Sequence, residues 1–252
     1  MRRLALLFVA SLALVGAGAQ AQAAPAKGAA AKAAPTPVHK NVNDKGTFKQ
    51  CEGKKCHKAA VFQGHNAAKT TYRTEPLEKP SGTIAISAEN LGESTTLNIY
   101  KPDGSFDEAS LAKLDDMYRC VKTGEVRAVR AELYEQLSRI YDHFGGKQIQ
   151  LVSGFRFAER DSSRHFHASA MDIRVADTSF RDVYAFAETL DMGNMGIGQY
   201  PTTGFVHIDF RAPGEPSYRW TDYSGHGSGP GHAKKPAKKP TGHTQPARKP
   251  VS

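Results

Sequence analysis

Two short stretches of the chain carry side chains that can bind a metal ion. Residues 163–173 include His165 and Asp172, and residues 205–210 include His207. Any one of these residues is more often an ordinary polar group on a solvated surface. Together they form a nitrogen and oxygen ligand set that suits zinc and leaves a fourth position for water. The combination therefore predicts a zinc site at His165, Asp172 and His207.

Both stretches alternate apolar and polar residues, a pattern typical of strands with one buried face. The apolar residues of the second stretch would point to the core, while His207 and Asp209 would point the other way. Asp172 lies on the polar face of the first stretch. His165 stands seven residues earlier, so it must lie in the loop that enters this strand. We expect the ligands on the sheet face opposite the core.

Several short motifs together resemble a known group of zinc peptidases. They are Ser153-Gly154-Phe155-Arg156, Ser163-x-His165-x6-Asp172, Gly196-x-Gly198-x-Tyr200-Pro201, Phe205-Val206-His207-x-Asp209 and Tyr218-Arg219-Trp220. The set is similar to the D-Ala-D-Ala carboxypeptidase and hedgehog-like group, and within it to the murein endopeptidase K-like branch. The resemblance spans residues 82–220 and rests on the combination of motifs, since each alone is weak. It implies a zinc peptidase that acts on peptidoglycan.

The resemblance also implies how such a site works. Zinc would lower the pKa of its bound water to about 7 and would polarise a peptide carbonyl. Arg156 would stabilise the charge that develops on the carbonyl oxygen, or would hold a substrate carboxylate by a two-pronged contact. The plainer interpretation of Arg156 is a surface ion pair.

The residue that transfers the proton stays open. Related dipeptidases place Glu three residues before the last ligand, where this chain has Gly204. Asp209 is a candidate to move the proton, or else a carboxylate that orients a ligand. His167 is a further acid–base candidate and an alternative ligand to His165. The family usually has glycine where Ala168 stands, and alanine is tolerated there if φ stays negative.

Periodicity places these residues in one domain over residues 81–224, long enough for a single hydrophobic core. Strands are expected at residues 83–87, 95–100, 149–152, 170–175, 195–200 and 205–210. Helices are expected from residue 107, over 127–144, and from a Thr178 or Ser179 cap to Leu190. We expect an α+β fold of the hedgehog and D-Ala-D-Ala-peptidase type, with an antiparallel sheet and helices packed on one face.

The start of the chain has the form of a secretory signal peptide. Residues 1–23 begin with Arg2 and Arg3, continue with an apolar run, and end in small residues that offer a cleavage site. The run is too short and too rich in Ala and Gly for a stable span, and an uncleaved anchor is the alternative. We predict a periplasmic or secreted protein without a transmembrane span in the mature chain.

Residues 24–80 are rich in Ala, Lys, Pro and Thr, so we expect a linker. Inside it, Cys51 and Cys56 favour a small disulfide loop in an exported protein. A metal or haem site is the alternative, although the spacing differs from Cys-x-x-Cys-His. Cys120 is the remaining cysteine and is expected to be a small buried hydrophobic residue.

The positive charge of the chain lies in its flanks. The whole sequence has a formal charge of +9, but residues 81–224 hold 15 Lys and Arg against 21 Asp and Glu, a net charge of −6. Nucleic acid is therefore not an expected partner. Residues 225–252 form a basic Gly/Pro/Lys tail, expected to be disordered. The tail would adhere to anionic envelope polymers, unless it is only a soluble appendage.

We predict an exported zinc metallopeptidase that hydrolyses peptide bonds of peptidoglycan stem peptides or cross-links, as a murein endopeptidase or a D,D-carboxypeptidase. One alternative is a catalytically inactive, zinc-containing module that binds the cell wall, because fold alone does not give activity. Another is an exported structural protein that acts through its basic flanks. The sequence does not determine which peptidoglycan bond is cut.

Overall fold

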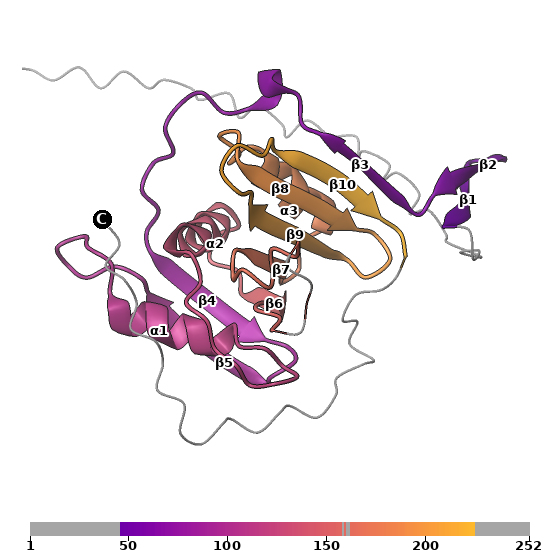
Figure 1. Ribbon diagram of the computed structural model, residues 1–252. Coiled ribbons are helices and arrows are strands. Elements are labelled where there is room, and N and C mark those ends of the chain that lie inside the picture. Colours follow the sequence, from indigo (N-terminus) through magenta and orange to yellow (C-terminus); the bar gives the residue numbers. More distant parts are fainter. Residues whose placement is uncertain (1–45, 158, 160–161, 225–252) are drawn as a thin grey trace, which may run out of the picture. The chain divides into compact units, whose positions relative to one another are not determined.

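The computed structural model describes residues 46–157, 159 and 162–224 (Figure 1). The expected signal peptide and basic tail lie outside these residues. The strands are β1 (Thr47–Glu52), β2 (Lys55–Ala60), β3 (Phe62–Asn66), β4 (Thr83–Ala88), β5 (Glu93–Asn98), β6 (Ile149–Ser153), β7 (Ala170–Val175), β8 (Met195–Tyr200), β9 (Phe205–Phe210) and β10 (Tyr218–Asp222). The helices are the 3-10 helix η1 (Lys69–Thr71), α1 (Glu108–Met117), α2 (Ala131–His143) and α3 (Phe180–Glu188).

In the described part of the chain, eight strands form one sheet in the order β3-β10-β8-β9-β7-β6-β4-β5. Most neighbouring strands are antiparallel, but β4 and β6 are parallel, and so are β8 and β10. The fold is α+β, as predicted, with a mixed rather than purely antiparallel sheet. Strand β4 pairs with its hairpin partner β5 on one side and with β6 on the other. Strand β8 likewise pairs with its hairpin partner β9 on one side and with β10 on the other. In both cases the chain comes back to the free side of the first strand and runs parallel to it.

The helices bury one face of the sheet. The apolar stripe of α2, with Leu133, Leu137 and Ile140, is fully buried and belongs to one core with Met171 of β7 and Ile208 of β9. Helix α2 packs on β4, and α3 packs on β7, β8 and β9 (Figure 1). The opposite face of β7 and β9 is therefore left for polar groups.

Two helices begin where the sequence predicts a helix start, and each has a capping side chain. The Asp107 side chain accepts a hydrogen bond from the backbone of Ala109 at the start of α1. Ser179 does the same for Arg181 at the start of α3. Such caps satisfy backbone N–H groups that have no partner within the helix. Among the described residues, no helix has both the length and the apolar character needed to cross a membrane.

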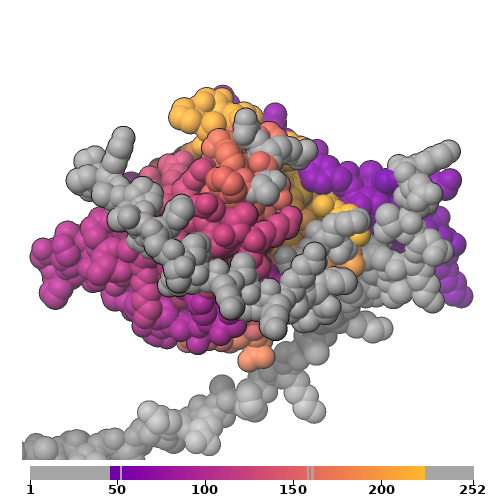
Figure 2. Space-filling model, turned by 60° about the horizontal axis from the view of Figure 1, so that its bottom comes forward, coloured from indigo at the N-terminus to yellow at the C-terminus, as the bar shows by residue number. Residues whose placement is uncertain are grey.

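Part of the expected linker has regular structure. Strands β1 and β2 pair with each other and are joined by a disulfide between Cys51 and Cys56. Strand β3 extends the main sheet by pairing with β10, and in the space-filling view of Figure 2 the indigo segment adjoins yellow C-terminal residues. The linker interpretation does not describe residues 47–71. Every described side chain of β3 is exposed, so β3 is held in the sheet by its backbone hydrogen bonds to β10. Amino-acid composition gives no sign of such bonds.

Candidate metal centre

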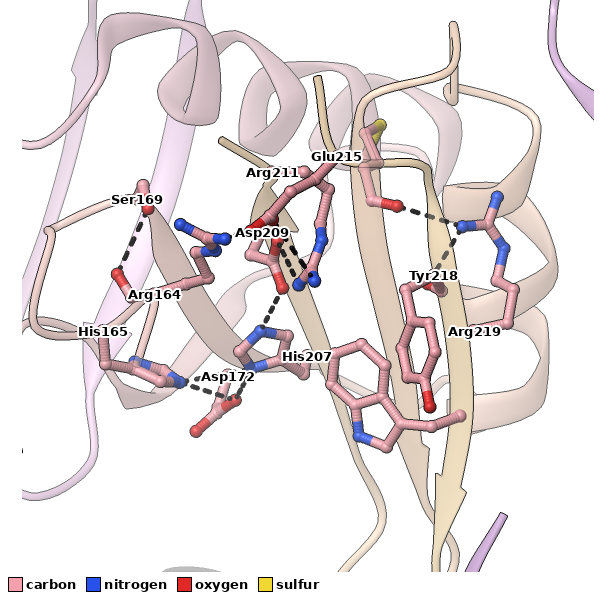
Figure 3. Close-up of polar contacts among 12 residues, drawn as sticks. Arg164, His165, Ser169, Asp172, His207, Asp209, Arg211, Glu215, Tyr218 and Arg219 are labelled. Atoms are coloured by element: carbon pink, nitrogen blue, oxygen red, sulfur yellow. Dashed lines mark hydrogen bonds and ion pairs between the residues drawn. The ribbon is translucent and has the colours of Figure 1, made fainter. Parts of the chain in front are cut away.

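Three predicted ligands meet on the sheet face opposite the helices (Figure 3). Asp172 on β7 lies directly across from His207 on β9, and His165 reaches them from the loop that enters β7. The Oδ1 atom of Asp172 is 2.8 Å from His207 Nδ1 and 3.4 Å from His165 Nε2, and the two nitrogens are 3.2 Å apart. All three residues are buried.

These separations fit a zinc ion. Ligand atoms held 2.0–2.2 Å from a tetrahedral zinc lie about 3.3–3.6 Å from one another. Two of the three separations already lie close to this range, and only Asp172 and His207 would move apart by about 0.5 Å to reach it. One carboxylate and two imidazoles are also ligands that zinc accepts.

Both histidines are held so that one ring nitrogen faces the cluster. His165 Nδ1 lies 2.7 Å from the carbonyl oxygen of Gly154 and donates to it. His207 Nε2 lies 3.0 Å from Oδ2 of Asp209 and donates to it. The other nitrogen of each ring is then directed at Asp172. Metal-ligating histidines typically donate their second N–H to a carbonyl or a carboxylate in this way.

The charges of the cluster are strongly coupled. Burial would raise the pKa of Asp172, but the neighbouring His165 and His207 outweigh this effect and hold its pKa well below the ordinary value. Burial would lower the pKa of His207, but hydrogen bonds to Asp172 and Asp209 raise it to about 9. Burial lowers the pKa of His165. In the metal-free protein the proton therefore resides on His207, between two carboxylates.

Two glycines of β8 make room for the groups around His207. A Cβ at Gly196 would overlap the carboxylate of Asp209, and a Cβ at Gly198 would overlap the indole ring of Trp220. The indole of Trp220 consequently lies against Gly198, with its ring centre 4.9 Å from that of His207. The Gly-x-Gly motif thus serves close approach to the site.

A protein-family model described as peptidoglycan L,D-endopeptidase MepK matches residues 79–213, more than half of the chain. The chain belongs to this family. The match includes all three ligand residues and confirms the family resemblance recognised in the sequence.

Two relatives illustrate the similarity. The probable peptidoglycan L,D-endopeptidase MepK of Haemophilus influenzae is 30% identical over 118 residues, which cover 41% of this chain and 62% of the relative. The peptidoglycan L,D-endopeptidase MepK of Escherichia coli K12 is 28% identical over 139 residues, which cover 50% of this chain and 75% of the relative. The chain thus spans less than two thirds of the Haemophilus relative. No solved structure matches the chain significantly.

Arg156 contacts the candidate metal centre itself. One guanidinium nitrogen lies 2.6 Å from Oδ2 of Asp172, and Nε donates to the hydroxyl of Ser153 at 2.9 Å. Since one of its partners is a buried ligand, Arg156 is more than a surface ion pair. Its side chain is 36% exposed, which leaves it within reach of a substrate.

The loop before β7 separates the two histidine candidates. His165 is buried in the cluster, whereas His167 is exposed and lies outside it. The condition under which alanine would be tolerated at position 168, a negative φ, is not met, because the φ of Ala168 is 51°. The chain turns sharply here, and the Ala168 N–H bonds back to the carbonyl of His165. A left-handed turn is a conformation that glycine adopts most readily, which agrees with the glycine that the resemblance implies at this position.

Some residues around the site were not assigned a role from sequence. Tyr200 accepts a hydrogen bond from the indole of Trp220 at 3.1 Å, and both belong to motifs that resemble the family. Arg164, Arg211 and Glu215 form an ion-pair group beside Asp209 (Figure 3). Only proximity to the ligands in the sequence could have indicated the two arginines, and Glu215 gave no signal.

Proposed function

We propose that this protein is a zinc-dependent L,D-endopeptidase that hydrolyses peptide bonds in peptidoglycan cross-links. One observation carries the proposal: the ligand atoms of His165, Asp172 and His207 lie 2.8–3.4 Å apart, with both imidazoles fixed from behind, in a member of this family. The bond specificity rests on the names of the relatives. D,D-carboxypeptidase activity is the alternative. It would release a terminal D-Ala, whereas an endopeptidase would cleave the cross-link.

The three ligands would hold the zinc ion. When bound, zinc supplies Lewis-acid chemistry, which activates water near neutral pH and polarises a peptide carbonyl. The protein prepares this site with the Gly154 carbonyl and the Asp209 carboxylate, which fix the two imidazole rings before any ion arrives. Fixing the rings lowers the entropy lost on metal binding and keeps the ligand geometry constant.

Arg156 would stabilise the developing negative charge of the substrate carbonyl oxygen. Its guanidinium remains charged at every working pH and is anchored by Ser153 and Asp172. A preorganised donor of this kind favours the transition state, because it needs no rearrangement as charge develops.

Asp209 is better suited to orient His207 than to transfer a proton to the substrate. Its side chain is 2% exposed, and its Oδ2 atom is engaged with His207 Nε2. A general base needs to reach the proton it abstracts, directly or through one water. We therefore assign Asp209 to positioning of His207. The activity of Asp209→Asn at saturating zinc distinguishes this role from proton transfer.

Export is part of the proposal. Peptidoglycan lies outside the cytoplasm, and the sequence of residues 1–23 favours secretion to the periplasm or beyond. The basic tail would add contacts to anionic envelope polymers without taking part in the chemistry.

The proposal is tested on the purified protein by measuring its metal content and its action on purified sacculi. We expect about one zinc per chain and new muropeptides from cleaved cross-links, and both should be lost in His207→Ala. The matched control is His65→Ala, because His65 lies exposed on β3 outside the metal cluster. Zinc without products would favour the inactive wall-binding module, and absence of bound metal would refute the site.

A further inference from the structure

Two arginines beside the metal centre share a single acidic partner. Arg164 donates to Oε2 of Glu215, and a guanidinium nitrogen of Arg211 lies 3.5 Å from the same oxygen. Arg211 also lies 3.5 Å from Oδ1 of Asp209, whose other oxygen accepts the hydrogen bond from His207 (Figure 3). The two cations thus converge immediately behind the residue that orients a metal ligand.

Both guanidiniums have spare hydrogen-bonding capacity. The Nε atoms of Arg164 and Arg211 are buried and have no hydrogen-bond partner among the described residues. Their side chains are 16% and 22% exposed, so most of each cation is removed from water. A buried guanidinium is stable where carboxylates satisfy its donors, and an incompletely paired one is a strong anion-binding group.

Their shared partner, by contrast, is partly exposed to solvent. The Glu215 side chain is 42% exposed and lies in the turn between β9 and β10. Residues 213–216 of this turn are exposed, and Gly214 has a φ of 84°. Among the described residues, the Glu215 side chain accepts one further hydrogen bond besides those of the arginines, a 3.3 Å bond from the backbone of Ala212. An exposed carboxylate on an exposed turn can be displaced by another carboxylate without disturbing the core.

We propose that Arg164 and Arg211 form a subsite for a carboxylate of the peptidoglycan stem peptide, and that Glu215 occupies this subsite when no substrate is bound. The inference rests on the proposed function and deepens it by naming a substrate group. Arg164 directly precedes the ligand His165, and Arg211 follows Asp209 by two residues. A carboxylate held there would therefore fix the peptide beside the metal centre.

Arginine suits this role because its planar fork matches a carboxylate in two-pronged contact. The stem peptide has two sources of such a group: a side-chain carboxylate and the carboxylate at the peptide's C-terminus. A merely structural role, in which Arg211 holds Asp209, is less well supported. The Arg211–Asp209 contact is 3.5 Å long, whereas His207 already holds Asp209 at 3.0 Å.

The test uses the purified full-length protein and three synthetic cross-linked stem peptides. One has both carboxylates free, one has the side-chain carboxylate converted to a carboxamide, and one has the C-terminal carboxylate converted. For the wild type we expect a loss of at least tenfold in kcat/KM, mainly through KM, on one of the two conversions. That peptide identifies the group that enters the subsite.

Arg164→Gln and Arg211→Gln should remove this preference, because they should weaken binding of the free carboxylate and leave the matching carboxamide little affected. Glu215→Gln should strengthen the preference several-fold, since the competing charge is gone. The control is Arg181→Gln, an exposed arginine on α3 at the helix side of the sheet. Equal losses on the free and amidated peptides, or no wild-type preference, would overturn the subsite.

Binding of the same peptides to His207→Ala by calorimetry separates this inference from the proposed function. A carboxylate preference that depends on both arginines, without hydrolysis by the wild type, would leave the subsite standing and refute the peptidase. Hydrolysis by the wild type with no dependence on the arginines in either assay would refute the subsite alone.

Discussion

Replacing Asp209 by Asn removes one negative charge from the position behind His207 and changes almost nothing in volume. The carboxylate is 2% exposed and accepts from His207 Nε2 at 3.0 Å, so the lost interaction is a buried, charge-assisted hydrogen bond. Such a bond contributes about 1.5–3 kcal/mol. Loss of an outer partner of a ligating histidine typically costs 10–100-fold in metal affinity, which is about 1.4–2.7 kcal/mol. The two estimates agree.

We therefore expect Asp209→Asn to bind zinc 10–100-fold more weakly than the wild type and to recover most of its activity once zinc is saturating. The assay is competition with a chromogenic chelator, followed by hydrolysis of a cross-linked muropeptide over a range of free zinc. Asp182→Asn is the matched control, because Asp182 is exposed on α3 at the helix side of the sheet.

The reasoning would be refuted by unchanged zinc affinity together with a loss of activity that saturating zinc does not restore. That result would move Asp209 from orienting His207 to transferring the proton during hydrolysis. A loss of folding would be visible as a changed urea midpoint and would call for Asp209→Glu as the second variant.

Three further predictions concern protons, packing and a buried ion pair. Because the pKa of His207 is raised to about 9, His207 in the metal-free protein is protonated at pH 7.5, and zinc binding should release close to one proton from it. The number of protons released should fall towards zero above pH 9. Calorimetry in buffers of different ionisation enthalpy measures this number. Gly198→Ala should destabilise the protein by about 1–3 kcal/mol in urea unfolding, because the new methyl group overlaps the Trp220 indole, and an unchanged midpoint would contradict the packing. Asp191→Asn should cost about 3–5 kcal/mol, because it removes the buried carboxylate 2.5 Å from Arg219, which is itself 4% exposed, and leaves the 42% exposed Glu188, 3.2 Å away, as the carboxylate neighbour of that cation. A cost below about 1 kcal/mol would show that the pair is not buried in solution.

The three candidate metal ligands could be chosen from the sequence because their identities and their strand faces are local properties. Alternation along a strand places His207 and Asp209 on one face whatever the rest of the fold does. The seven-residue spacing required His165 to come from a loop, and it does. Helix starts at Asp107 and Ser179 were likewise readable, because a cap acts on the next few residues only.

Other features depended on partners far away in the chain. Arg156 was expected to face the substrate, but only the folded sheet brings Asp172, sixteen residues later, to its guanidinium. The composition of residues 47–71 gave no sign of β3, because β10 holds that strand through backbone hydrogen bonds. Ala168 could not be assigned its positive φ, since this angle is imposed by the turn that delivers His165.

By itself, then, the sequence determined which side chains are candidate zinc ligands, which strand faces they occupy and which family the chain resembles. The tertiary structure decided that the Trp220 indole packs against Gly198, and that Arg164 and Arg211 both contact Glu215. The physical reason is distance along the chain. Propensity, capping and alternation act over a few residues, whereas strand neighbours and ion pairs depend on how distant segments meet.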